Sequence, residues 1–154
     1  LHTMQEQLHQ NRQFLHRLFQ EAPGGIATAD AGTGTILDAN LAMCELTGYL
    51  REELIGMHQS KLHPPEHPQG GLTESFQAHT QDREGQGIRT RILTRSGIIR
   101  YVDIKASTQR LRDQRIIHGF FYDVSDHVHN ERELETSLRI MELFNLPMQT
   151  VERL

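Results

Sequence analysis

The sequence predicts an α+β domain: a five-stranded antiparallel sheet, with short helices on one face and a helix at each end of the chain. Two short apolar segments joined by turn-forming residues predict a hairpin at 26–37. Three alternating segments between residues 87 and 122 predict the other strands. Apolar residues at helical spacing between the hairpin and the later strands, and at both ends of the chain, predict helices that complete the order of elements. Covering one sheet face with helices is the simplest packing for that order.

Residues 1–22 form an N-terminal amphipathic helix in this prediction. Apolar residues recur every seven positions as in a short coiled coil, with Leu18 in the second set of the repeat. The helix ends before Pro23, because proline disfavours helical geometry in the residue that precedes it. We expect this helix to form a homodimer, or to pack on the outer face of the sheet, through Leu8, Leu15, Leu18 and Phe19.

Short helices follow the hairpin. Asn40 is a good N-cap for a helix over 41–47, and Gly48 is a good stop for it. Residues 52–55 predict another helical turn. Prolines exclude a continuous helix over 57–71.

The three C-terminal strands are expected at 87–94, 101–106 and 116–122, with short turns between them. We expect Ser125 or Asp126 to cap a last helix, which ends before Pro147. The chain therefore divides into three parts. Residues 1–22 form the N-terminal flanking helix, and residues 23–124 form the central domain. Residues 125–154 form a linker helix and the start of a next segment.

Composition indicates one globular domain with helical extensions. The chain has 154 residues, of which 36% are hydrophobic and 23% charged, and no apolar stretch is long enough to span a membrane. A formal net charge of −4 gives no reason to expect contact with nucleic acid. The single cysteine cannot form an internal disulfide, and the N-terminus lacks a signal-peptide pattern. We therefore expect a cytoplasmic location.

Eight short motifs stand in order along residues 22–126, each in a segment of the expected type. They are Ala22-Pro-Gly-Gly-Ile26, Asp30-Ala-Gly32, Asp38-Ala-Asn40, Leu46-Thr-Gly-Tyr49, Glu52-Glu-Leu-Ile-Gly56, Leu62-His-Pro64, Arg95-Ser-Gly97 and Asp123-Val-Ser125. Together they resemble the PAS family of sensory domains, and the last one is similar to that family's Asp-Ile-Thr signature. The resemblance implies the PAS fold over this range.

The resemblance implies a sensory and dimerisation module of a larger bacterial-type signalling protein, such as a histidine kinase, a diguanylate cyclase or a transcription regulator. The module would pass a small-molecule or conformational signal to a C-terminal output domain. Asp123 and the capping residue Ser125 would link the last strand to the output helix. The alternative is a PAS domain without a ligand that serves only dimerisation and relay. A small enzyme is a remote alternative, because no catalytic motif stands in a supporting context.

The resemblance also implies a ligand pocket between the sheet and the short helices. Alternation along the strands places on that side Ile88, Thr90, Ile92, Val102, Ile104, Ala106, Gly119 and Phe121. From the helical segments we expect these to be faced by Leu46, Leu54, Leu62, Leu72, Phe76 and His79.

The identity of a cofactor stays open, and haem and flavin are disfavoured. The light-sensing flavin branch of the family carries Asn-Cys-Arg after the glycine that corresponds to Gly56, where this chain has Met-His-Gln-Ser-Lys. The oxygen-sensing haem branch carries its iron-ligating histidine seven residues after the proline that corresponds to Pro64. Gly71 occupies that position here.

Three histidines lie close together in the sequence, at positions 58, 63 and 67, and imidazole is a common metal ligand. Prolines between His63 and His67 prevent them from standing one helical turn apart, and no cysteine or carboxylate set completes a site. We therefore expect a loop of solvated histidines and no metal.

Overall fold

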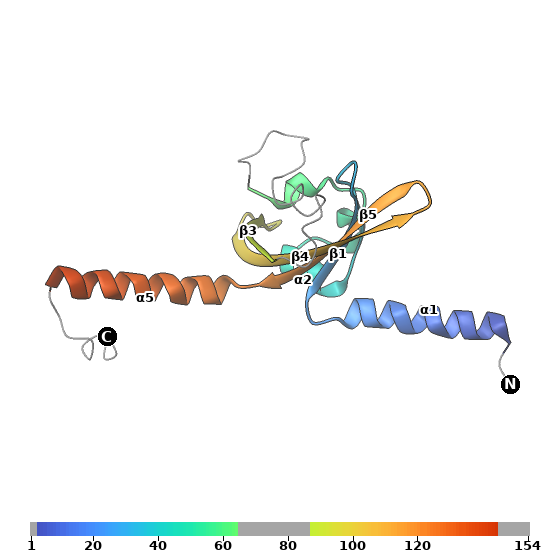
Figure 1. Cartoon of the computed structure of the whole chain (residues 1–154), viewed down its shortest axis with the longest axis horizontal. Coiled ribbons are helices and arrows are strands. Elements are labelled where there is room, and N and C mark those ends of the chain that lie inside the picture. Colours follow the sequence, from blue (N-terminus) through green and yellow to red (C-terminus); the bar gives the residue numbers. More distant parts are fainter. Residues whose placement is uncertain (1–2, 65–86, 145–154) are drawn as a thin grey trace. The chain divides into compact units, whose positions relative to one another are not determined.

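The computed structural model describes residues 3–64 and 87–144 (Figure 1). Contacts within the chain divide it into two units, Leu1–Asp123 and Val124–Leu154. The first unit contains a five-stranded antiparallel sheet in the order β2-β1-β5-β4-β3, which confirms the expected sheet. Its strands are β1 (Gly25–Asp30), β2 (Ile36–Ala39), β3 (Ile88–Leu93), β4 (Ile99–Leu111) and β5 (Gln114–Asp123).

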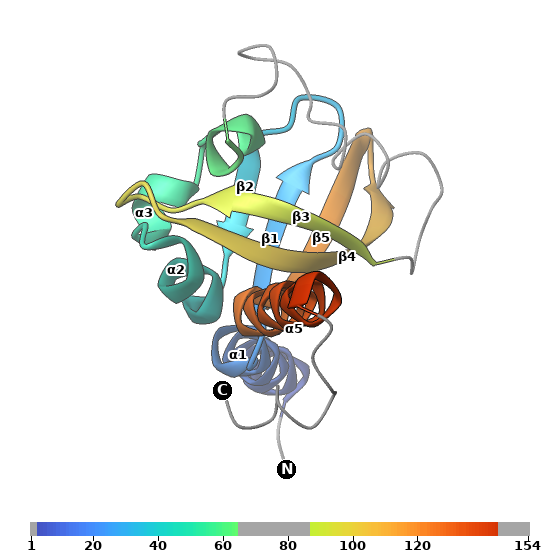
Figure 2. The same cartoon turned by 90° about the vertical axis from the view of Figure 1, so that its left-hand side faces the viewer.

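Three short helices pack against one face of this sheet (Figure 2). They are α2 (Leu41–Thr47), α3 (Arg51–Leu54) and the 3₁₀ helix η1 (Gln59–Leu62). Side chains from all three helices form one buried cluster with the strands, and this cluster comprises Ala27, Ile36, Ala39, Met43, Leu46, Leu54, Leu62, Ile92, Val102 and Ile104. The core therefore lies between the sheet and these helices. Fully burying one large aliphatic side chain stabilises a fold by about 1.5–3 kcal/mol.

Asn40 joins three elements at the start of α2. Its side chain is fully buried, and its Oδ1 accepts hydrogen bonds from the backbone amides of Ile26 at 2.8 Å and Met43 at 3.0 Å. Its Nδ2 donates to the carbonyl oxygens of Phe19 at 2.9 Å and Gly24 at 3.0 Å. One amide therefore caps α2, as expected, and also fixes the path of the chain into β1.

The N-terminal helix α1 (Met4–Glu21) begins at a capping box. The hydroxyl of Thr3 accepts from the amide of Glu6 at 3.2 Å, and the carboxylate of Glu6 accepts from the amide of Thr3 at 3.1 Å. The helix ends at the residue before Ala22, ahead of the expected proline stop. None of its residues is buried in this chain.

The β4–β5 hairpin is longer than its sequence pattern predicts. Hydrophobic alternation ends at Ala106, but cross-strand pairing continues to Leu111 opposite Gln114. The sequence favours a turn at Asp113-Gln114, but the turn lies one residue earlier, at 112–113: Arg112 takes the left-handed backbone with φ 55°, and Gln114 already belongs to β5. Gln114 donates from Nε2 to Oδ2 of Asp30 at 2.9 Å. The alternation of apolar and polar residues is lost between residues 107 and 115 because this end of the hairpin is largely exposed on both faces.

The described part of the second unit is the helix α5 (Ser125–Phe144). His127 lies 2.9 Å from Glu131, and His129 lies 3.0 Å from Glu133, each pair spanning one helical turn. Among the helices that the structure describes, none is both long and apolar enough to cross a membrane.

We predict that Asn40→Ala lowers the free energy of unfolding by about 2–4 kcal/mol, because it removes a helix cap and leaves buried backbone groups without partners. Thr3→Ala is the matched control, since it removes a cap that is exposed, and its expected loss is about 0.5–1 kcal/mol. Urea denaturation measures both. Equal losses would show that Asn40 acts only as a helix cap.

Candidate functional site

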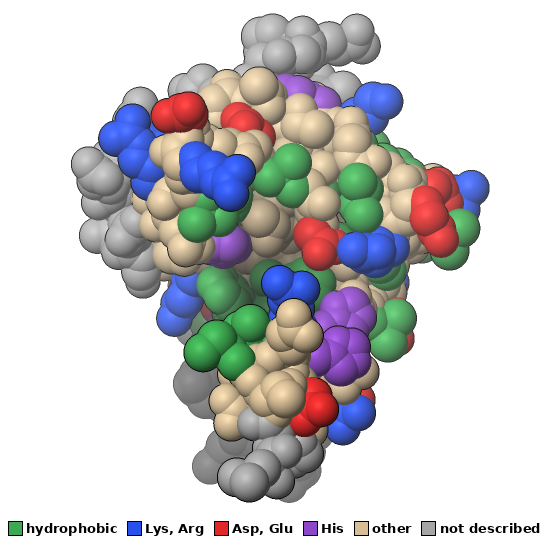
Figure 3. Space-filling view, turned by 90° about the vertical axis from the view of Figure 1, so that its right-hand side faces the viewer, with side chains coloured by type: hydrophobic (Ala, Val, Ile, Leu, Met, Phe, Trp, Pro, Cys, Tyr) green, Lys and Arg blue, Asp and Glu red, His purple; other side chains and the backbone are tan. Residues whose placement is uncertain are grey.

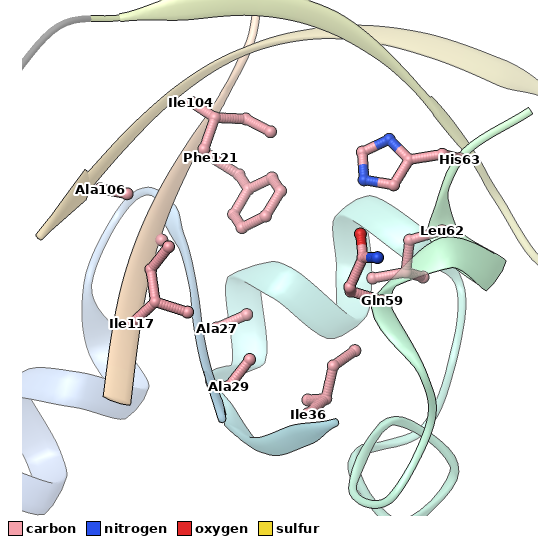
Figure 4. Close-up of a pocket in the computed structure, with 11 residues that line it drawn as sticks. Ala27, Ala29, Ile36, Gln59, Leu62, His63, Ile104, Ala106, Ile117 and Phe121 are labelled. Carbon is pink, nitrogen blue, oxygen red and sulfur yellow. The ribbon is translucent and has the colours of Figure 1, made fainter. Parts of the chain in front are cut away.

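An apolar cavity of about 60 Å³ lies between the sheet and η1 (Figure 4). The strands β1, β2, β4 and β5 supply most of its lining, which comprises Ala27, Ala29, Ile36, Ile104, Ala106, Ile117, Gly119 and Phe121. On the other side, η1 and the residue after it contribute Gln59, Leu62 and His63. This cavity is the candidate functional site.

Small residues in register form the sheet side of the cavity. Gly119 of β5 lies opposite Ala27 of β1 and opposite Ala106 of β4, so three residues with at most one side-chain carbon stand in a row across the sheet. A Cβ added to Gly119 would lie 2.9 Å from Cε2 of Phe121, so the phenyl ring rests close against the glycine backbone. The cavity exists because larger side chains are missing from this row.

Two polar side chains, one on η1 and one on the residue after it, face the cavity. The side chain of Gln59 is buried, and its backbone amide donates to the carbonyl oxygen of Gly34 at 2.8 Å, which ties η1 to the β1–β2 turn. Nδ1 of His63 lies 3.2 Å from the carbonyl oxygen of Arg91 on β3. A carbonyl oxygen only accepts, so Nδ1 carries the hydrogen of this bond, and Nε2 of a neutral ring is then an acceptor.

The structure brings some of the expected pocket residues to the cavity and places others beside it. The cavity is lined by Leu62, Ile104, Ala106, Gly119 and Phe121. The adjacent buried core contains Leu46, Leu54, Ile92 and Val102. On β3, half-buried positions opposite Ile104 and Val102 are occupied by Ile88 and Thr90. Three expected residues lie outside the described part of the chain, namely Leu72, Phe76 and His79.

Sequence reasoning missed several residues of the cavity lining. Ala27 and Ala29 alternate with more exposed residues along β1, and this alternation is a signal that could have placed them on the inner face. Gln59 and His63 carry no comparable signal, because a 3₁₀ helix of one turn gives no repeating pattern. Ile36 and Ile117 lie on strands that were expected, but their part in the cavity depends on strand register.

Asp123 ends β5 beside a cation. Its Oδ2 lies 3.5 Å from Nη1 of Arg100 on β4, and both side chains are 40% exposed. Solvent screening limits such an exposed pair to about 0–1 kcal/mol. Ser125 is the first residue of α5 and therefore lies inside the first turn, one position later than an N-cap.

The apolar residues of the expected dimer surface are largely exposed in this chain. More than half of the surface of Leu8, Leu15 and Leu18 is open, while Phe19 near the end of α1 is half-buried. Figure 3 looks toward the N-terminal end of α1 and shows hydrophobic side chains gathered on one flank of that helix. The three leucines are therefore largely uncovered within the described part of the chain.

The histidines and the cysteine give no metal or redox site among the described residues. No group of three or more His, Cys, Asp or Glu side chains within residues 3–64 and 87–144 is placed to hold a metal ion. Nδ1 of His58 accepts from the amide of Ser60 at 3.2 Å and so caps η1, while His67 lies outside the described residues. Burial raises the pKa of the Cys44 thiol, which keeps it protonated at neutral pH.

A search with protein-family models decides the family. The model of the PAS fold matches residues 13–124, which is most of the chain. The chain belongs to the PAS family. The PAS domain is a sensory module, and sensory signalling is the role of this one. None of the proteins of curated function matches the sequence significantly.

Solved structures share the fold of this PAS domain. The PAS domain of an HTR-like protein from Haloarcula marismortui is 20% identical with a TM-score of 0.63, over 77% of this chain and 96% of that one. A domain of a sensory box sensor histidine kinase/response regulator from Geobacter sulfurreducens is 27% identical with a TM-score of 0.54, over 73% and 95%. A sensory box histidine kinase/response regulator from Burkholderia thailandensis E264 is 22% identical with a TM-score of 0.60, over 87% and 99%.

We predict that Ala106→Val changes the free energy of unfolding by less than about 1 kcal/mol, because the added methyl groups enter the cavity. Ala39→Val is the matched control, since Ala39 is fully buried in the packed cluster, where overpacking costs about 1–3 kcal/mol. Thermal or urea unfolding measures both variants. Equal destabilisation at the two positions would mean that the space beside Ala106 is filled in solution.

Proposed function

We propose that this PAS domain binds a small molecule in the cavity and transmits the occupancy of that cavity along β5 to α5. The observation that carries the proposal is the cavity itself, an apolar space with two polar side chains between the sheet and η1. Such a combination of apolar walls and few polar groups is typical of small-molecule sites. Two of its lining residues, Gly119 and Phe121, lie on β5 within a few residues of Asp123.

The output end of the proposal rests on the order of elements. β5 ends at Asp123, and α5 begins two residues later without an intervening loop. A change in the position of β5 would therefore reach the helix directly. The two sensory box proteins from Geobacter sulfurreducens and Burkholderia thailandensis are described as histidine kinase/response regulators. We infer that this module controls an output domain of that class, beyond its C-terminal helix.

A homodimer is the proposed assembly, and α1 is its proposed contact. The apolar flank that contains Leu8, Leu15 and Leu18 is exposed in the described chain, and its seven-residue spacing suits a partner helix. Phe120 and Tyr122 add exposed aromatic surface on β5.

The proposed location is the cytoplasm, because the sequence has one cysteine and no disulfide partner for it.

The small volume of the cavity favours a second candidate function, a PAS domain that has no ligand and acts only in dimerisation and relay. A native mass spectrum of the purified protein separates the two functions. We expect dimer masses that carry an additional small-molecule mass. Dimer masses with no added mass, even after incubation with cell metabolites, would support the second function instead.

We predict that Asp123→Ala speeds amide hydrogen exchange across residues 123–135 relative to the strand segment 116–122. The physical reason is the loss of the carboxylate that holds the end of β5 near Arg100. Because that pair is exposed, global stability should fall by only about 0–1 kcal/mol.

Asp103→Ala is the control for this experiment, since Asp103 makes a comparable exposed pair with Arg89 at 3.1 Å that joins β4 to β3 and not to β5. It should leave exchange in 123–135 unchanged. The relay role of Asp123 is wrong if both variants give the same exchange pattern.

We predict that Leu8→Glu combined with Leu15→Glu converts the dimer to a monomer, because burying unpaired charge costs several kcal/mol. Gln10→Glu combined with Gln13→Glu adds the same charge on the opposite flank of α1 and should leave the dimer intact. Light scattering measures both. A wild-type protein that is already monomeric at high concentration contradicts the proposed dimer.

A further inference from the structure

We propose that two copies of α5 pack along one face and bind one zinc ion between them through His127 and Glu131 of each copy. This site requires the proposed homodimer, because each copy supplies only half of the ligands. Three features of α5 support it: the spacing of its exposed leucines, the position of a His–Glu pair on the same face, and the distance between the two side chains of that pair.

The exposed leucines of α5 follow the spacing of a coiled coil. Leu134 is 58% exposed, Leu138 is 38% exposed, and they lie one turn apart on one face. His127 and Glu131 precede them by seven residues each, so the same face continues toward the start of the helix. Met141 continues the repeat but is already buried within the chain. We call the open part of this face, formed by His127, Glu131, Leu134 and Leu138, the α5 seam.

A second copy of the same helix is the partner that fits the α5 seam. In a parallel pair related by a two-fold axis, each seam residue lies against its own counterpart, so Leu134 and Leu138 meet leucines. Near the start of the helix, His127 meets His127 and Glu131 meets Glu131. Two carboxylates that face each other at an interface repel, and an apolar partner would leave them buried without an opposite charge. A cation held between the two copies removes this repulsion.

The distance within the His–Glu pair suits chelation of that cation. Nε2 of His127 lies 2.9 Å from Oε1 of Glu131. Zinc binds histidine nitrogen and carboxylate oxygen at about 2.0–2.2 Å in a tetrahedral arrangement, so two of its ligand atoms lie roughly 3.3–3.5 Å apart. The side chains of His127 and Glu131 are 63% and 51% exposed, so they are free of the packing that would prevent a shift of about half an ångström.

Two copies complete the ligand set. Within residues 3–64 and 87–144 of a single chain, no group of three or more potential ligands is placed to hold a metal ion, so one copy offers only a two-point site. Two histidines and two carboxylates together make the four ligands of a tetrahedral ion, and imidazole favours zinc over magnesium or calcium. Glu131 makes a further interaction within its chain, and its carboxylate can keep that interaction because it has about four acceptor positions.

A second His–Glu pair on α5 provides an internal control. Nε2 of His129 lies 3.0 Å from Oε1 of Glu133, and the two residues are again four positions apart. These positions lie two residues, or about 200°, further round the helix than His127 and Glu131, so they are on the flank opposite the α5 seam. A second copy that packs on the seam leaves this pair with two ligands only.

The test is a calorimetric titration of the protein, without a polyhistidine tag, with zinc chloride at about pH 7.5, where free imidazole is mostly neutral. We expect one zinc ion per two chains. His127→Ala should raise the dissociation constant for zinc more than about a hundredfold, because losing a partner outside the ligand shell already costs about 10–100-fold and this change removes two direct ligands. His129→Ala is the matched control and should leave that constant unchanged.

Light scattering on the same samples measures assembly. Because the complete site exists only in the dimer, free zinc at about 100 times its dissociation constant should lower the dissociation constant of the dimer about a hundredfold. His127→Ala should abolish this effect, and so should Glu131→Gln, which keeps the shape of the side chain without its charge.

Three results would overturn the zinc site: a stoichiometry of one zinc per chain, zinc affinity that His127→Ala and His129→Ala change equally, and zinc affinity that His127→Ala leaves unchanged. A protein that dimerises but binds no zinc would overturn the site and leave the proposed homodimer intact. A protein that stays monomeric with and without zinc would overturn the homodimer as well.

Discussion

The pairing register of β1, β5 and β4 determines where every side chain on the helix-covered face of the sheet lies. Because Gly119 stands opposite both Ala27 and Ala106, small residues meet in one row and leave a space above it. A shift of one residue would turn Ile26, His118 and Lys105 or Ser107 toward the core. The cavity, the position of the Phe121 ring and the placement of Asp123 beside Arg100 all follow from this single register.

The register is held at one end by a buried amide. Asn40 binds the last turn of α1, the start of β1 and the first turn of α2 through four hydrogen bonds. At the other end, Gln114 and the carbonyl oxygen of Arg115 bind the β1–β2 turn at Asp30 and Ala31. Polar contacts therefore secure β1 against its neighbours at both ends, while the apolar cluster between sheet and helices supplies most of the stabilising burial.

Two surfaces of different character surround the cavity. The core cluster beside it is fully packed, with Met43, Leu54, Ile92 and Val102 almost completely buried. The row of small residues is instead underpacked, and a natural core loses stability by leaving such space empty. This contrast within one sheet face is consistent with the proposed ligand site. Gly119 and Phe121, which line this space, lie on β5, and β5 ends at Asp123 just before α5. For that reason β5 is the proposed route of the signal.

The sequence by itself determined the order of the described elements, both caps of α2 and the family. Asn40, Gly48 and the proline after α1 define local geometry, and local geometry depends on neighbours in the chain. Only the tertiary structure decided which residues line the cavity. Gln59 and His63 come from a one-turn helix and the residue after it, and the row across Ala27, Gly119 and Ala106 joins residues far apart in the sequence. Alternation assigns a residue to a face of its strand, but the register between strands decides which residues on that face meet.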